Sequence, residues 1–244
     1  MKPVDLLITN GRILTMSDDL DVIERGLLAV RGDTIVAVEP QTEHSNGYEA
    51  SKYIDAQGGL VMPGLINAHT HAAMTCFRGL ADDLPLMDWL EKHIFPAESK
   101  LTSDWVYKGT LLACAEMIAS GTTTFCDMYL YADFVARAAK DAGLRAVVGE
   151  VLYDFDSPNY GPIEKGLKYT QDLIDSWRSD PLIRIAVEPH SAYLCSPELL
   201  AQAKAIGDRE QASMVIHLSE SEQEVQQVQQ IGRASCRERV CHRV

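Results

Sequence analysis

Histidine recurs at the ends of short apolar runs in this sequence of 244 residues, and histidine at such positions can bind a metal ion. His69 and His71 lie two residues apart, shortly after the apolar run 60–62, which we interpret as a buried parallel strand. Because residues i and i+2 of a strand point to the same face, both imidazoles could face one ion. A His-x-His pair alone is also typical of a polar loop. His190 and His217 end two further apolar runs, which favours the metal site.

A carboxylate follows the last of these histidines at a distance that suits proton transfer. Glu220 lies three residues after His217, just past the apolar run. It could reach a water molecule held by a metal without being a ligand itself. The alternative is a glutamate that only stabilises a helix N-terminus, but Glu222 and Glu224 are better placed for that role. We therefore expect Glu220 to be catalytic.

The elements that must position these residues alternate between strand and helix after residue 61. Regular alternation of this kind predicts an α/β fold with a parallel sheet. No dinucleotide-binding glycine fingerprint or phosphate-binding loop is present, so a barrel fits better than a Rossmann sheet. Catalytic groups of such barrels lie at the carboxyl ends of the strands, where the histidines occur. The expected strands after the first are 122–128, 145–152, 183–190 and 213–218, and the expected helices are 88–98, 103–120, 131–142, 163–178, 196 onward and 219–230.

Residues 1–60 have a different pattern, with short strands and turn signals. Asn10-Gly11 separates two apolar runs and predicts a hairpin, and Gly32-Asp33 predicts a second one. Residues 53–56 add another short strand. We therefore divide the chain into 1–60, part of a small β domain, and 61–230, the first five βα units of a barrel. A complete barrel of this type has eight units.

Composition excludes several classes of partner. The net charge of −13 argues against nucleic acid and anionic membranes. No apolar run is long enough for a transmembrane helix, and the first residues do not resemble a signal peptide. The six cysteines have no disulfide-framework spacing, which indicates a reducing, cytoplasmic setting. Residues 231–244 hold four arginines and one glutamate, an abrupt basic change that predicts an artefactual tail or, alternatively, a genuine basic tail.

The stretch 63–71, Pro-Gly-Leu-Ile-Asn-Ala-His-Thr-His, resembles the end of the first barrel strand in the amidohydrolase superfamily. Within it the chain is similar to the 5-methylthioadenosine/S-adenosylhomocysteine deaminases and their chlorohydrolase relatives, from the N-terminus to about residue 230. The resemblance implies a truncated (β/α)8 TIM-like barrel. It also implies that residues 1–60 form half of a β-sandwich, and that a further histidine and a metal-binding aspartate lie beyond residue 230.

The same resemblance implies roles for individual residues. His69, His71 and His217 would bind one divalent metal, zinc or else iron, and Glu220 would shuttle the proton. The histidine of Pro189-His190-Ser191-Ala192-Tyr193 would contact the substrate. Glu98 would grip the ribose hydroxyls, with a surface helix residue as the alternative. Trp89 could pack on a flat base or be a buried aromatic residue at a helix start.

The function that these roles imply is metal-dependent hydrolytic deamination of adenine nucleosides, with release of ammonia. 5-Methylthioadenosine, S-adenosylhomocysteine and adenosine are the expected small-molecule substrates of the full-length parent enzyme, which is also expected to form homo-oligomers. The alternatives are another heterocycle hydrolase, such as a guanine deaminase or a triazine chlorohydrolase, and an inactive incomplete fragment. For the 244-residue chain itself we expect no activity and poor solubility, because five strands leave sheet edges unpaired.

Overall fold

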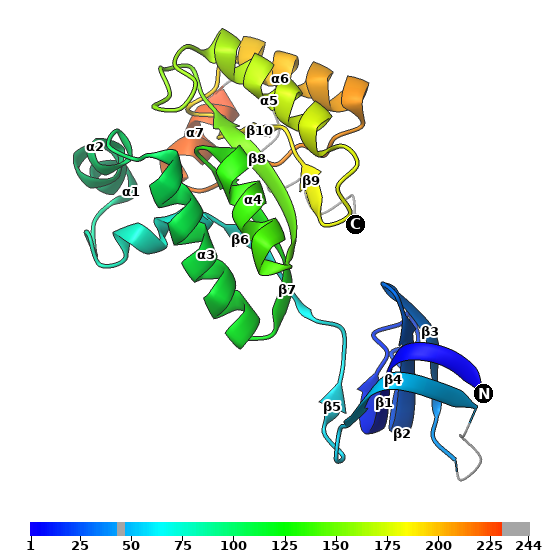
Figure 1. Ribbon diagram of the computed structural model, residues 1–244. Coiled ribbons are helices and arrows are strands. Elements are labelled where there is room, and N and C mark those ends of the chain that lie inside the picture. Colours follow the sequence, from blue (N-terminus) through cyan, green and yellow to red (C-terminus); the bar gives the residue numbers. More distant parts are fainter. Residues whose placement is uncertain (43–46, 231–244) are drawn as a thin grey trace. The chain divides into compact units, whose positions relative to one another are not determined.

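A computed structural model describes residues 1–42 and 47–230 of the chain (Figure 1). These residues belong to two compact units, Met1–Gly64 and Leu65–Val244. The predicted tail 231–244 lies outside the described residues. The domain limits proposed from the sequence, 1–60 and 61–230, stay predictions. None of the described helices is long and apolar enough to cross a membrane.

The first unit is a mixed β-sheet in which one long strand pairs with three others. Its strands are β1 (Lys2–Leu14), β2 (Val22–Arg31), β3 (Thr34–Pro40), β4 (Tyr48–Asp55) and β5 (Leu60–Val61). The order is β3-β2-β1-β4, with β5 also on β1; β2 pairs with β1 and β3 antiparallel, whereas β4 and β5 run parallel to β1. Val4, Leu7, Leu27 and Ala29 pack together as its buried core. The Gly32-Asp33 turn is confirmed, because it joins β2 to β3.

The predicted hairpin at Asn10-Gly11 is wrong, because β1 continues through both residues. Asn10 has a left-handed backbone, with φ of 52°, and its backbone N–H donates to Gln41 Oε1 at 2.7 Å. The pairing register with β2 shifts on either side of Gly11, so the dipeptide forms a β-bulge. A Cβ atom at Gly11 would lie 2.6 Å from Val61 Cγ2, so glycine lets β5 approach. Asn and Gly both readily adopt the left-handed backbone conformation, which occurs in β-bulges as well as in tight turns. The Asn-Gly dipeptide alone therefore does not distinguish a bulge from a turn.

The second unit has the predicted α/β pattern around one curled parallel sheet. Its strands are β6 (Leu65–Thr70), β7 (Thr122–Tyr129), β8 (Arg145–Leu152), β9 (Ile183–Ile185) and β10 (Glu188–Pro189), in the order β10-β8-β7-β6 with β9 also on β8. The helices that alternate with them are α3 (Ser103–Ala119), α4 (Ala132–Ala142), α5 (Ile163–Trp177), α6 (Pro197–Glu210) and α7 (Glu222–Gln230) (Figure 1). The sheet and its helices form the curled part-barrel that the alternation predicts.

The apolar run 60–62 is not the buried parallel strand that we expected. Leu60 and Val61 form β5 of the first unit, and the strand that carries the histidines begins at Leu65. Leu65 and Ile66 are 50% and 72% exposed. β6 is the last strand in the described order of its sheet, so its side chains have strand neighbours on one side only.

Two further predicted strands are less regular than expected. The segment 183–190 is divided into β9 and β10, and 213–218 makes only isolated bridges, Val187 to Met214 and Ser191 to His217. Backbone hydrogen bonds still hold these segments side by side, including His217 N–H to His190 O at 2.8 Å. Pro189 has no N–H to donate, which interrupts the ladder between them.

The loops and caps that follow the strands position the site. After β6 come the 3₁₀ helix η1 (Ala72–Phe77) and a helical segment made of α1 (Leu86–Trp89), the π-helix η2 (Leu90–Ile94) and α2 (Phe95–Glu98). The predicted helix 88–98 is thus confirmed, with a wider turn in its middle. Ser196 caps α6 by accepting from Leu199 N–H, and Gly143 ends α4 with a φ of 77°.

Candidate functional site

Three of the predicted histidines come together at the carboxyl ends of the strands. His69 is the second-last residue of β6, His71 is the first residue after this strand, and His217 lies in the segment that bridges to Ser191. One ring nitrogen from each histidine lies within 4.8 Å of the others, and His71 Nε2 is 3.3 Å from His217 Nε2. We call these three residues the histidine cluster. They are the one group of three or more potential metal ligands found among the described residues.

The hydrogen bonds of His71 determine which nitrogen can bind a metal. Its Nδ1 lies 2.6 Å from the carbonyl oxygen of Met128, which can only accept a hydrogen bond. Nδ1 therefore carries a proton, which leaves Nε2, the nitrogen nearest His217, as the atom that can bind a metal. Burial, followed by the neighbouring His71, lowers the pKa of His217, which favours the neutral imidazole that metals require.

The cluster has the donor set and spacing of a zinc site. Two nitrogens bound to one tetrahedral zinc at about 2.0–2.1 Å would lie roughly 3.3–3.4 Å apart. The separation between the Nε2 atoms of His71 and His217 is 3.3 Å. Three imidazoles also leave positions for a carboxylate and a water molecule, as in catalytic zinc sites. The residues present therefore fit a single divalent metal, and iron would accept the same ligands.

His190 lies against the cluster but is not one of its three members. Its ring stacks on His217 with the centroids 4.7 Å apart and meets the edge of Tyr193 at 5.7 Å. Burial, and then the neighbouring His217 and His71, lower the pKa of His190 to about 3, so the ring is neutral near pH 7. Its Nδ1 is buried and has no hydrogen-bond partner among the described residues. That nitrogen is therefore free for a ligand.

Glu220 lines the same cavity as His71, His190 and His217. The hydroxyl of Tyr193 donates to its Oε2 at 2.8 Å, and its own backbone N–H donates to Glu224 Oε2 at 2.8 Å. The left-handed backbone of Ser219, with φ of 57°, turns the chain between His217 and Glu220. The alternative role at the helix N-terminus belongs to other residues, because the first turn of α7 holds Glu222 and Glu224.

The helical segment 86–98 also lines this cavity, and we call it the helical wall. Trp89 lines the cavity, and its indole Nε1–H donates to Ala81 O at 3.1 Å. Glu98 also lines it, and burial raises the pKa of this carboxyl group to about 7, with the nearby phenol of Tyr129 opposing part of the rise. The remaining lining is mostly apolar and includes Met74, Leu90, Phe95, Met128, Tyr153 and Leu194.

The cavity has a volume of about 80 Å³. This is below the roughly 300–1,000 Å³ of typical small-molecule sites, so a nucleoside would need room beyond it. The structure thus gathers all the predicted site residues, His69 excepted, around one small cavity, and His69 lies beside it with its ring centroid 5.1 Å from that of His217.

Two residues near the site were missed by the sequence reasoning. Tyr193, which hydrogen-bonds Glu220, lies in the same short motif as His190, and its position there was a signal that could have been used. Asp127 is a fully buried carboxylate in the apolar strand β7, and it hydrogen-bonds both neighbours of His71. A lone aspartate in an apolar run is a signal of the same kind, because a buried charge needs partners.

Two other buried carboxyl groups lie on the strands beside β7. Glu150 of β8 accepts hydrogen bonds from Ala132 N–H at 2.8 Å and from Asn159 Nδ2 at 3.0 Å. Both carboxyl oxygens of Glu188 lack partners among the described residues, and burial raises its pKa well above the ordinary value. A Cβ atom at Gly149 would lie 2.3 Å from the Glu188 side chain, so glycine makes room for it.

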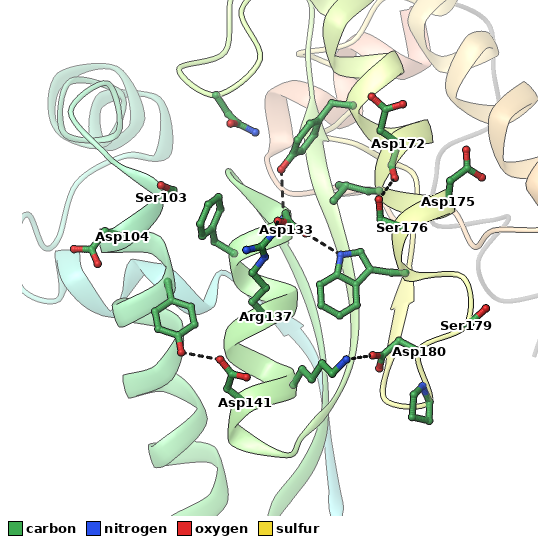
Figure 2. Close-up of a pocket in the computed structure, with 18 residues that line it drawn as sticks. Ser103, Asp104, Asp133, Arg137, Asp141, Asp172, Asp175, Ser176, Ser179 and Asp180 are labelled. Atoms are coloured by element: carbon green, nitrogen blue, oxygen red, sulfur yellow. Dashed lines mark hydrogen bonds and ion pairs between the residues drawn. The ribbon is translucent and has the colours of Figure 1, made fainter.

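A wider hollow of about 1370 Å³ lies between α3, α4 and α5 (Figure 2). Its aspartates already have partners: Asp133 accepts from Trp177 Nε1 at 2.9 Å, Asp141 from Tyr107 at 2.8 Å, and Asp180 from Lys140 at 2.6 Å. No histidine is among its described lining residues, so this hollow lacks the metal-ligand set of the cavity at the strand ends.

Comparison with known proteins agrees with this geometry. A profile described as "Amidohydrolase family" matches residues 60–240. A 5-methylthioadenosine/S-adenosylhomocysteine deaminase of Syntrophobacter fumaroxidans is 61% identical over 224 residues, which are 92% of this chain and 51% of the relative. A 5'-deoxyadenosine deaminase of Methanosarcina mazei is 43% identical over 91% of this chain and 50% of its own length. The chain thus spans about half the length of these curated relatives.

Solved structures show the same fold. The crystal structure of an adenosine deaminase from Xanthomonas campestris with bound zinc superposes with a TM-score of 0.91 at 37% identity, over 95% of this chain and 53% of that one. A triazine hydrolase from Arthrobacter aurescens superposes with a TM-score of 0.84 over 97% of this chain and 57% of that one. At 21% identity, the second likeness concerns the fold alone.

Proposed function

Because the chain belongs to the amidohydrolase family, we propose that it supplies part of a metal-dependent hydrolase that deaminates adenine nucleosides. The histidine cluster, with Glu220 on the same cavity, is the observation that carries this proposal. The names of the relatives support it, since they are deaminases of 5-methylthioadenosine, S-adenosylhomocysteine and 5'-deoxyadenosine. The substrate is accordingly a small molecule, and 5-methylthioadenosine, S-adenosylhomocysteine and adenosine are the candidates.

His69, His71 and His217 would hold the metal, and zinc is the first choice because a 37% identical deaminase structure contains it. Bound there, the ion would act as a Lewis acid and lower the pKa of a water molecule so that it attacks near neutral pH. His71 is prepared for this role, since the Met128 carbonyl holds its proton on Nδ1. Iron is the alternative metal.

Glu220 would move the proton of the reaction. Its carboxylate would take a proton from the attacking water and deliver it to N1 of the purine. It would then take the proton of the hydroxyl group added at C6 and pass it to the amino group, which leaves as ammonia while the C6 carbonyl forms. The hydrogen bond from Tyr193 fixes one carboxylate oxygen and leaves the other available for the proton. Neutral His190, with its free Nδ1, could hydrogen-bond the base during this step.

The helical wall would recognise the rest of the nucleoside. Trp89 offers an aromatic face for the flat base, and Glu98 offers carboxylate oxygens to the ribose hydroxyls. We further propose a cytoplasmic enzyme that acts as a homo-oligomer and binds neither nucleic acid nor membrane, in keeping with the net charge of −13. Guanine deamination and triazine dechlorination are less favoured, because the relatives of 41–61% identity are deaminases of adenine nucleosides.

A chimera would test this function. Residues 1–230 would be joined to the C-terminal half of the Syntrophobacter fumaroxidans relative, and ammonia release would be measured with each substrate. We expect turnover of 5-methylthioadenosine, S-adenosylhomocysteine, 5'-deoxyadenosine or adenosine to exceed turnover of guanine and of a chlorotriazine. Faster release from guanine, or faster loss of chloride from the triazine, would overturn the substrate class.

Glu220→Gln in the same chimera is the matched variant. It should keep the bound zinc and the circular dichroism spectrum of the parent but lose about 10²–10⁴-fold in turnover, the usual cost of removing a general acid–base group. Near-normal turnover would show that another group moves the proton. The 244-residue chain should show no turnover in the same assay, and a deaminating preparation of it would contradict our expectation of an inactive fragment.

A further inference from the structure

Asp127 contacts the two residues that flank His71 in the chain. It is fully buried near the end of β7, where it pairs with Thr70 of β6. Its Oδ1 lies 2.7 Å from the hydroxyl oxygen of Thr70, which is also 2.8 Å from the Cys126 carbonyl oxygen, and it accepts the backbone N–H of Ala72 at 2.5 Å. Thr70 and Ala72 are the residues immediately before and after His71. One carboxyl oxygen thus contacts the side chain before a member of the histidine cluster and the backbone after it.

The next residue of β7 completes the arrangement. The carbonyl oxygen of Met128 lies 2.6 Å from Nδ1 of His71 and holds the imidazole ring itself. Asp127 and Met128 are consecutive, so the end of one strand fixes both the backbone and the ring of His71. The ring then presents Nε2 at 3.3 Å from His217 Nε2. If the backbone around His71 shifted, both the Met128 contact and this separation would change together.

We propose that Asp127 positions His71, and that the metal affinity of the histidine cluster depends on this positioning. This inference rests on the proposed function, because it assumes that the cluster binds a divalent metal. Asp127 does not touch the metal or the substrate in this role; it acts only through the chain at Thr70, His71 and Ala72. Groups of this kind typically change metal affinity by about 10–100-fold when they are removed.

A simpler explanation is that Asp127 only stabilises the fold, as any buried hydrogen-bonded carboxylate would. The chain contains a close control for this explanation. Glu150 is equally buried near the end of the neighbouring strand β8, and its Oε2 accepts from the N–H of Ala132, the first residue of α4. Asp127 makes the same contact with Ala72, the first residue of η1. Only Asp127 has a metal-binding candidate between the two residues that it contacts.

The test compares Asp127→Ala and Glu150→Ala in the 244-residue chain. Zinc affinity would be measured by competition with a chromophoric chelator, and cobalt(II) would be added separately to record the absorption spectrum of the site. We expect Asp127→Ala to weaken zinc binding by about 10–100-fold and to change the cobalt spectrum. Glu150→Ala should lower the melting temperature but leave both metal readouts close to those of the parent.

Asp127→Asn is the conservative variant, since its amide oxygen can still accept from Thr70 and Ala72. Asp127→Asn should bind zinc with an affinity within about threefold of the parent. If the negative charge of Asp127 were needed for metal binding, Asp127→Asn would instead lose affinity as Asp127→Ala does. If Asp127→Ala fails to fold, Thr70→Val removes one of the two contacts at a half-buried position and should weaken zinc binding in the same direction. Parent-like affinity in the folded alanine or valine variant would overturn the inference.

Two results separate this inference from the function it rests on. A parent chain that binds no zinc, or whose binding survives His71→Ala, would overturn the metal site and this inference with it. A parent that binds one zinc through His71, together with equal losses in Asp127→Ala and Glu150→Ala, would overturn the inference alone. That second result would leave the proposed metal site intact.

Discussion

The histidine cluster and the helical wall face the same cavity but are held in different ways. The cluster is fixed by main-chain contacts: His71 to the Met128 carbonyl, and His217 N–H to the His190 carbonyl. Among the described residues, the lining side chains of the helical wall have one such contact, from the Trp89 indole to Ala81 O, and the others are mostly apolar. A main-chain oxygen keeps its place when side chains are substituted, whereas apolar packing tolerates volume-conserving changes. We therefore call the histidine cluster the rigid side of the cavity, where we expect the chemistry, and the helical wall the adaptable side, where we expect substrate choice.

The largest effect should come from the rigid side. His71→Ala in the chimera removes one proposed ligand and leaves the Met128 carbonyl without its donor. We expect zinc affinity to fall by more than the roughly 100-fold that outer groups can cost, and turnover to disappear. Zinc content after dialysis and ammonia release would be measured together. Full zinc occupancy in this variant would show that the cluster is not the metal site.

A smaller effect should come from the helical wall. Glu98→Ala removes a carboxylate that we expect to accept hydrogen bonds from ribose, each worth about 1.5–3 kcal/mol when the acceptor is charged. The value of kcat/KM for nucleosides should fall by about 10–100-fold. Release of ammonia from free adenine should change little, because adenine has no ribose. An equal loss on both substrates would remove Glu98 from the ribose site.

Tyr193 belongs to neither side of the comparison, and it orients Glu220 by a side-chain contact at 2.8 Å. Tyr193→Phe should lower kcat about tenfold, which corresponds to a hydrogen bond of about 1.4 kcal/mol, with KM and zinc content unchanged. The effect should vanish when Glu220→Gln is already present. Tyr107→Phe, which loses a hydroxyl bonded to Asp141 in the hollow of Figure 2, is the matched control and should be silent.

The smallest expected effect is a pH dependence from Glu98. Burial raises the pKa of Glu98 to about 7, so the group gains its negative charge as pH rises through 7. The value of kcat/KM for nucleosides should therefore rise several-fold between about pH 6 and 8, and Glu98→Gln should flatten this rise. A profile that keeps the same slope in Glu98→Gln would assign the titration to another group.

The same shift has a consequence for stability. A carboxyl group whose folded pKa lies above its ordinary value of 4.5 holds more protons in the folded state than in the unfolded state. Its contribution is therefore complete below about pH 4.5 and is lost as pH rises through 7. Glu98→Gln should reduce the fall in melting temperature over this interval, and an undiminished fall would contradict the shift.

Sequence alone predicted the rigid side better than the adaptable side. Strand periodicity and the position of strand ends predicted that His69, His71, His190 and His217 meet, and the resemblance then selected all but His190 as metal ligands. Trp89 and Glu98 were proposed only through the resemblance, since nothing in a local helical pattern says which face lines a cavity. Asp127 was missed because its role depends on a pairing between β6 and β7 that spans 57 residues.

The wrong predictions about the fold have a similar cause. Asn10-Gly11 has the same local preference in a bulge as in a turn, and only the pairing of β1 with β2 and β5 decides between them. The run 60–62 is apolar enough for either unit, and its pairing with β1 could not be read from its composition. The interruption at Pro189, by contrast, could have been predicted, because proline cannot donate to a ladder.

The π-helix Leu90–Ile94 lets the helical wall differ by one residue in length during divergence without turning its ends around the helix axis. A π turn holds about one residue more than an α turn and is best understood as a single-residue insertion into a regular helix. Because the π turn takes up this extra residue, losing it would leave a regular α-helix in which Glu98 keeps nearly the same side relative to Trp89. In an alignment, a one-residue gap between the counterparts of Trp89 and Glu98 would therefore mark relatives that have a regular helix here and still present the same group at this place.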